Sequence, residues 1–111
     1  MKIVLLIDDE PEMGSLVGMC LDEAGARVVQ VHDLAEAIAA GRHEGPSLVL
    51  LDLALGSEDG LDILPRLRGE TALSGVPIVA FSVHESRRGE ALDQGVDGFV
   101  AKPFKALDLR R

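Results

Sequence analysis

The 111-residue sequence predicts an α/β fold in which five parallel strands form one sheet with helices on both faces. Short β-branched and leucine-rich runs alternate with longer segments of helical period, which is typical of repeated βα units around a buried sheet. Most of the runs are nearly all apolar, as strands covered on both faces must be. The length and a hydrophobic content of 47% suit one domain over residues 1–111 with a single core.

Each predicted strand is a short apolar or β-branched run that polar residues follow. The second run is the most polar, so we expect it nearest an edge of the sheet. The five runs are residues 3–7, 27–31, 48–52, 78–81 and 98–101.

The first two helices are predicted from apolar spacing and from glycines that would end them. Gly25 follows the first set of apolar residues, where a helix would stop. Asp33 with Glu36 three residues later is typical of a helix start, and we expect the second helix to close at Gly41. The apolar residues at helical spacing are Met13, Leu16, Val17, Cys20 and Ala24 in the first helix, and Leu34, Ala37 and Ile38 in the second.

Three further helices complete the pattern. Leu61, Leu64 and Leu67 predict the third, and Pro65 inside it should kink or delay its first turn because proline lacks a backbone donor. Residues 85–94 predict a more polar fourth helix. After residue 103 the sequence has room for about two turns of a short fifth helix.

Polar residues that can do chemistry follow or end four of the predicted strands. The carboxyl ends of parallel strands share one edge of the sheet, so these side chains should converge on one small site. Clustered carboxylates repel one another and require a cation, and an all-oxygen set of ligands suits Mg²⁺. A nearby lysine and hydroxyl would then favour phosphoryl transfer, with an aspartate as the nucleophile. The residues are Asp8, Asp9, Asp52, Ser82 and Lys102.

Composition argues against several other kinds of partner and site. With 19 acidic and 11 basic residues the formal charge is −8, the wrong sign for binding nucleic acid by this chain alone. The sequence contains no apolar run of membrane-spanning length, so we expect no membrane contact. Cys20 is the single cysteine and cannot form an internal disulfide, which makes a cytoplasmic location the expectation. His32, His43 and His84 lack the spacing of metal ligands.

Taken together, the motifs closely resemble those of the response regulator receiver domains of bacterial two-component systems. Their order and spacing carry the resemblance, which covers essentially the whole chain and implies a flavodoxin-like doubly wound sheet. The matching motifs are Ile7-Asp8-Asp9-Glu10-Pro11, Leu50-Leu51-Asp52-Leu53, Asp59-Gly60, Phe81-Ser82, Gly95-Val96-Asp97-Gly98-Phe99 and Lys102-Pro103-Phe104.

The resemblance implies a role for each residue of the expected site. Phe99 would be the switch aromatic, and the Lys102-Pro103 peptide a candidate for the cis geometry. On phosphorylation, Ser82 would be drawn toward the phosphoryl group and Phe99 would move inward. The implied site consists of Asp52 as phosphoacceptor, of Asp9, Asp52 and the carbonyl of Ala54 as direct Mg²⁺ ligands, of Asp8 acting through water, and of Ser82 and Lys102 holding the phosphoryl oxygens.

The resemblance also implies partners. The donor would be a sensor histidine kinase or a phosphotransfer protein, and the domain would switch a partner or effector surface without turning over an external substrate. We expect a C-terminal effector domain beyond this chain. The short final helix would leave apolar surface exposed, which is compatible with a homodimer through the fourth helix, fifth strand and fifth helix.

Other functions stay open at this point. A free-standing relay or phosphate-sink receiver would carry the same residues. An aspartyl-phosphate phosphatase or phosphotransferase would share the carboxylate, hydroxyl and lysine, although dehalogenase-like enzymes have a second aspartate two residues after the nucleophile, where this chain has Ala54. The third alternative is an interaction module with a vestigial site. The mass of the native gene product would separate a free-standing receiver from a longer regulator, and turnover of a small phosphate ester would favour the enzyme. Failure to label with acetyl phosphate and Mg²⁺ would favour the vestigial module.

Overall fold

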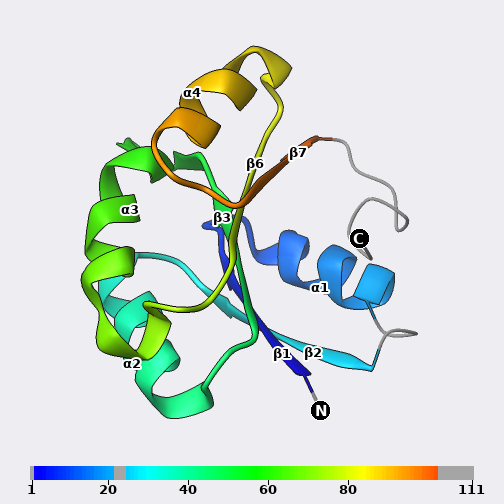
Figure 1. The fold of residues 1–111 in the computed structure, drawn as a ribbon. Helices are drawn as coiled ribbons and strands as arrows, with labels where there is room; N and C mark the ends of the chain where they lie inside the picture. The colour runs from blue at the N-terminus through cyan, green and yellow to red at the C-terminus, as the bar shows by residue number, and fades with distance from the viewer. Residues whose placement is uncertain (1, 22–24, 103–111) are drawn as a thin grey trace.

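The computed structural model describes residues 2–21 and 25–102, and in them five parallel strands form one sheet with helices on both sides (Figure 1). The strand order is β2-β1-β3-β6-β7. The strand predicted to lie nearest an edge is therefore an edge strand, and the predicted fold class is confirmed. The strands are β1 (Lys2–Ile7), β2 (Ala26–Val31), β3 (Leu48–Asp52), β6 (Ile78–Ser82) and β7 (Gly98–Ala101).

Alternate residues of the central strands feed two separate cores, one on each face of the sheet. In β1, Leu5 and Ile7 join the larger cluster, which contains the buried residues of α2 (Leu34–Glu44) and α3 (Gly60–Gly69). Val4 and Leu6 point the other way and pack with Val17 of α1 (Pro11–Leu21). This alternation is the two-residue period of a strand covered on both faces. Figure 1 shows α1 on one side of the sheet and α2 and α3 on the other.

Helix α1 begins before the first predicted apolar residue, and one residue expected on its inner face is exposed. Val17 is fully buried, but Leu16 is 47% exposed. Neighbouring helical positions lie about 100° apart, so both side chains cannot point at the sheet, and the prediction was wrong for Leu16. Ala24 lies outside the described residues.

Helix α2 starts as predicted but ends later. The Asp33 carboxylate accepts a hydrogen bond from the Glu36 amide at 2.9 Å, which caps the helix. The helix runs through Gly41 and ends at Gly45, which has the left-handed φ of 60°. Gly41 is needed for space, because a Cβ there would lie 2.9 Å from Leu73 Cδ2. The prediction therefore mistook Gly41, which packs against Leu73, for the glycine that ends the helix, which is Gly45.

The segments between β3 and β7 contain several short elements that the sequence pattern did not predict. A small antiparallel hairpin of β4 (Ala54–Leu55) and β5 (Glu58–Asp59) precedes α3, and a 3₁₀ turn, η2 (Thr71–Leu73), follows it. Pro65 lies inside α3, as expected. The predicted helix 85–94 is instead a 3₁₀ turn, η3 (Glu85–Arg87), followed by α4 (Arg88–Asp93). The first turn is a 3₁₀ turn because the Arg87 amide donates a hydrogen bond to the His84 carbonyl, three residues earlier.

Two expectations fall outside the part of the chain that the structure describes. The sequence predicts a fifth helix after residue 103 and a candidate cis peptide at Lys102-Pro103, and residues 103–111 lie outside the described part of the chain. Among the helices that are described, none has the length and apolar character needed to cross a membrane.

Gly60, the first residue of α3, lies directly against the end of β3. A Cβ at this position would lie 2.3 Å from the Asp52 backbone oxygen and 2.9 Å from Leu53 Cα. We expect Gly60→Ala to lower the free energy of unfolding by about 2–3 kcal/mol, because backbone atoms cannot move aside as a flexible side chain can. Urea denaturation followed by circular dichroism measures this loss.

The matched control is Gly89→Ala in α4, where a Cβ would meet nothing within 4 Å. That variant should keep or slightly raise stability, by at most about 1 kcal/mol. Equal stability of the two variants would contradict the close packing of α3 on β3.

Candidate functional site at the carboxyl edge of the sheet

The strands bring the sequence-predicted polar residues to one edge of the sheet. Asp8 follows β1, Asp52 ends β3, Ser82 ends β6 and Lys102 follows β7. The register sets Asp52 beside Phe81 and Ser82 beside Ala101, so the four chain segments end at nearly the same level. The topology thus gathers residues that are up to 94 positions apart (8 to 102).

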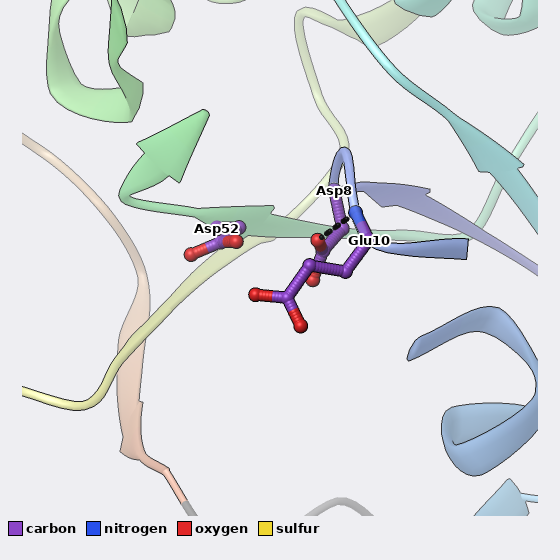
Figure 2. Close-up of side chains that lie close together, drawn as sticks. All are labelled: Asp8, Glu10 and Asp52. Carbon is purple, nitrogen blue, oxygen red and sulfur yellow. Dashed lines mark hydrogen bonds between the residues drawn. The ribbon is translucent and has the colours of Figure 1, made fainter. Parts of the chain in front are cut away.

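Three carboxyl groups form a tight cluster at this edge (Figure 2). One oxygen from each of Asp8, Glu10 and Asp52 lies within 4.8 Å of the other two. Figure 2 shows Asp52 extending from β3, while Asp8 and Glu10 come from the segment after β1. The Glu10 amide donates to Asp8 Oδ1 at 2.9 Å. Sequence reasoning gave Glu10 no role, although it is the third consecutive acid after the strand.

Asp9 lies outside this cluster in the structure. Its side chain is exposed, and Oδ2 lies 3.3 Å from the position that a Cβ at Gly56 would take. The Asp9 carboxylate therefore faces Gly56, which lies two residues after Ala54 in the turn between β4 and β5. Its role as a metal ligand stays a prediction.

Lys102 covers the buried acids with its ammonium group. Nζ lies 3.3 Å from Asp52 Oδ2 and 3.8 Å from Asp8 Oδ2, and it stands 4.6 Å from the centre of the Phe81 ring. The lysine side chain is 11% exposed. Charge pairing at such low exposure is screened far less than at the surface, so this contact holds the site together.

The acids under Lys102 are buried more deeply than isolated carboxylates normally are. Asp8 is 0% and Asp52 1% exposed, and the Oδ2 atom of each accepts no hydrogen bond from the described residues. Burial raises the pKa of Asp8 to about 6, although the Glu10 amide opposes the rise. The negative charge of Asp52 also raises the pKa of Asp8, whereas the positive charge of Lys102 lowers it. Two buried carboxylate oxygens that accept no hydrogen bond lie beside a third carboxylate. Such a set of oxygen ligands fits Mg²⁺.

Backbone groups orient the remaining polar atoms. The Ala54 amide donates to Asp52 Oδ1 at 3.0 Å, which leaves Oδ2 as the oxygen that faces Lys102. Ser82 is buried at the end of β6, and its Oγ accepts a hydrogen bond from the His84 amide at 3.0 Å. The Lys102 amide donates to the Ser82 carbonyl at 2.7 Å, which ties these two segments together.

Phe99 is already in an inward position. The residue is 7% exposed, the guanidinium carbon of Arg88 lies 5.0 Å from its ring centre, and Arg88 Nη1 donates to its carbonyl at 3.2 Å. The ring is therefore already buried in this conformation, and its movement on phosphorylation stays a prediction. A phenyl ring has no hydroxyl to hold in water, so burial and the cation–π contact favour the inward position.

An ion pair that the sequence did not suggest links the two loops that flank the site. Arg87 donates to both Asp59 oxygens, at 3.2 and 2.8 Å, and also contacts Glu90. Asp59 caps α3 by accepting from the Leu61 amide. Burial alone would raise the pKa of Asp59, but the bonds from Arg87 and Leu61 outweigh it and lower the pKa. The pair joins residues 28 apart, and no local pattern indicates it.

Comparisons with known proteins agree with this architecture. The family model of the response regulator receiver domain matches residues 4–111. The probable transcriptional regulatory protein TcrX of Mycobacterium tuberculosis is 37% identical over 108 residues, covering 96% of this chain and 45% of TcrX. The chain thus spans about half the length of the first curated relatives it matches.

Solved structures give the same result. The receiver domain of NtrX from Brucella abortus has a TM-score of 0.84 and 32% identity, with 96% of this chain and 91% of that chain covered. The receiver domain of the sensor histidine kinase PA1611 from Pseudomonas aeruginosa, which has a magnesium ion coordinated in its active-site cleft, has a TM-score of 0.83 and 28% identity, with 99% and 92% covered.

Removing the ammonium of Lys102 should leave two buried carboxylates without a counter-charge. We expect Lys102→Met, measured by urea denaturation at pH 7 with EDTA, to lower the free energy of unfolding by about 3 kcal/mol. Lys2→Met, at the exposed start of β1, is the control and should have little effect. An equal effect of the two variants would mean that Lys102 does not compensate the buried acids.

Proposed function

This chain belongs to the response regulator receiver family, and we propose that Asp52 accepts a phosphoryl group from a histidine kinase or phosphotransfer protein. One observation carries the proposal: Asp52 Oδ2 faces the Lys102 ammonium at 3.3 Å, inside a cluster of three carboxyl groups. Asp52 Oδ2 accepts no hydrogen bond from the described residues, so it becomes available as a nucleophile once the Lys102 ammonium moves.

The proposed transfer moves the phosphoryl group from a phosphohistidine of the donor protein to Asp52. Asp52 Oδ2 forms a bond to phosphorus while the phosphorus–nitrogen bond of the donor's phosphohistidine breaks. The donor's imidazole carries a proton on its other ring nitrogen before the transfer, so it leaves as a neutral ring. Lys102 pairs with the phosphoryl oxygens, and the Ser82 hydroxyl donates to one of them. Because the Lys102 side chain covers Asp52, it has to move aside as the donor approaches.

The acid cluster is the proposed site for Mg²⁺. Asp8, Asp52 and the newly found Glu10 offer carboxylate oxygens, while Asp9 and the Ala54 carbonyl remain the ligands implied by the family resemblance. Bound Mg²⁺ would neutralise the carboxylates and the entering phosphoryl oxygens. The magnesium ion in the cleft of the PA1611 receiver domain supports this choice of metal.

We propose that phosphorylation changes the surface formed by α4 and β7, where Arg88 covers Phe99. Drawing Ser82 toward the phosphoryl group would pull on the His84 amide and hence on η3, which carries Arg87. The output would be an effector domain or a second copy of the chain that contacts this surface. Relatives that are named transcriptional regulators support an effector of that kind.

The domain is proposed to act as a switch in the cytoplasm, without turnover of an external substrate. Its acyl phosphate would form and hydrolyse on Asp52 itself. Ala54 stands where dehalogenase-like phosphatases have a second aspartate, which argues against the enzymatic alternative. The single cysteine agrees with a reducing compartment.

Acetyl phosphate with Mg²⁺ should label the chain once, at Asp52. Intact mass spectrometry is expected to show a gain of one phosphoryl group that Asp52→Asn abolishes, because an amide cannot act as the nucleophile. Asp62→Asn, an exposed acid on α3, is the control and should label normally. Labelling of Asp52→Asn would place the acceptor elsewhere, and failure of the unaltered chain to label would revive the vestigial module.

Mg²⁺ should stabilise the folded chain by binding to the acid cluster. At a concentration of one hundred times Kd, it should add about 2.7 kcal/mol to the free energy of unfolding and raise Tm accordingly. Thermal unfolding by circular dichroism suits this chain, which has no tryptophan or tyrosine. Asp52→Asn should lose most of the rise and Asp62→Asn none of it. An undiminished rise in Asp52→Asn would exclude Asp52 from the metal site.

A further inference from the structure

We propose that Gln30 is a positioning residue of the phosphoacceptor site, whose side-chain amide fixes the acidic segment between β1 and α1. The inference rests on the proposed function. Gln30 Nε2 donates to the backbone carbonyls of Asp8 and Glu10, at 2.8 Å in each case. One amide group thus holds the segment on both sides of Asp9, and its two N–H donors match the two acceptors.

The strand register explains why β2 can reach this segment. Gln30 lies beside Leu6, and Val31 beside Ile7, so β2 runs as far along the sheet as β1. The Asp8 amide continues the ladder by donating to the Val31 carbonyl at 3.0 Å. Beyond that point the chain turns toward α1 and backbone pairing with β2 ends. There the Gln30 side chain supplies the hydrogen bonds to the segment instead.

Gly14 of α1 supplies a second, independent observation. A Cβ at this position would lie 2.3 Å from Gln30 Oε1 and 3.3 Å from Gln30 Cδ. Gly14 does not have a positive φ, so its backbone conformation does not favour glycine, and a Cβ here would instead force the Gln30 amide to shift. Helix α1 therefore packs against the Gln30 amide on one side, and the carbonyls of the acidic segment accept hydrogen bonds from it on the other.

This anchoring matters because the segment carries charges that repel one another. Asp8 and Glu10 lie within the same cluster as Asp52, and without a bound cation their charges push the segment away from β3. Mg²⁺ requires nearly octahedral geometry, so a small displacement of two carboxylates weakens its binding. Groups that orient metal ligands in this way commonly change metal affinity by about 10–100-fold.

The test compares Gln30→Leu with Gln94→Leu, which changes an exposed glutamine at the end of α4. We expect Gln30→Leu to raise the Mg²⁺ concentration for half-maximal acetyl phosphate labelling by about tenfold, while saturating Mg²⁺ restores the maximal rate. Gln94→Leu should leave both values unchanged. A lower maximal rate at an unchanged half-saturating concentration would overturn the proposal, because that pattern indicates general loss of folded protein.

Gly14→Ala provides a second route that leaves Gln30 itself intact. Its Cβ would displace the amide, so we expect the same shift in Mg²⁺ dependence, and the double variant Gly14→Ala/Gln30→Leu should shift no further than Gln30→Leu. Gly18→Ala, where a Cβ meets nothing within 4 Å, is the matched control on the same helix and should show no shift. Equal shifts in Gly14→Ala and Gly18→Ala would overturn the proposal.

A readout without metal or phosphoryl donor separates this inference from the proposed function. In ¹⁵N–¹H spectra of the unaltered chain, the side-chain amide protons of Gln30 should exchange with solvent more slowly than those of Gln94. Exchange as fast as that of Gln94 would contradict the two hydrogen bonds whatever the labelling shows. Failure of the unaltered chain to label, with protected Gln30 protons, would refute the phosphoacceptor function and leave the anchoring intact.

Discussion

The fold of this domain is organised around the cost of bringing carboxylates together at one edge of a sheet. Asp8 and Asp52 are buried beside Glu10, and each like charge raises the free energy of the others. The Lys102 ammonium offsets part of this cost from 3.3 and 3.8 Å. Part of the repulsion remains uncompensated, and it is the physical reason for our proposal that this edge binds a divalent cation and accepts a phosphoryl group.

Contacts outside the cluster hold the repelling groups in place from two directions. On one side Gln30 and Gly14 fasten the segment that carries Asp8 and Glu10. On the other side, Gly60 lets α3 pack closely against the end of β3 next to Asp52. These contacts fix the backbone on both sides of the acids, whereas the Lys102 ammonium reaches them at the end of a long side chain.

Local patterns predicted the five strands to within a residue at each end and placed the chemistry-bearing residues at their carboxyl ends. They failed where a residue's role depended on a distant neighbour. Gly41 reads like a helix end but serves to admit Leu73, and Leu16 shares the apolar spacing of α1 yet faces solvent. In the site, Glu10 went unassigned because its membership in the cluster depends on how the segment folds back over β3.

The sequence alone determined the parallel α/β architecture, the family, and the meeting of Asp8, Asp52, Ser82 and Lys102 at one edge, because periodicity and strand ends are local properties. Tertiary structure decided which acids share the cluster, the inward seat of Phe99 under Arg88, and the anchoring by Gln30. These depend on side-chain directions and on contacts between segments far apart in the chain. Such contacts are set by packing, which no single stretch of sequence encodes.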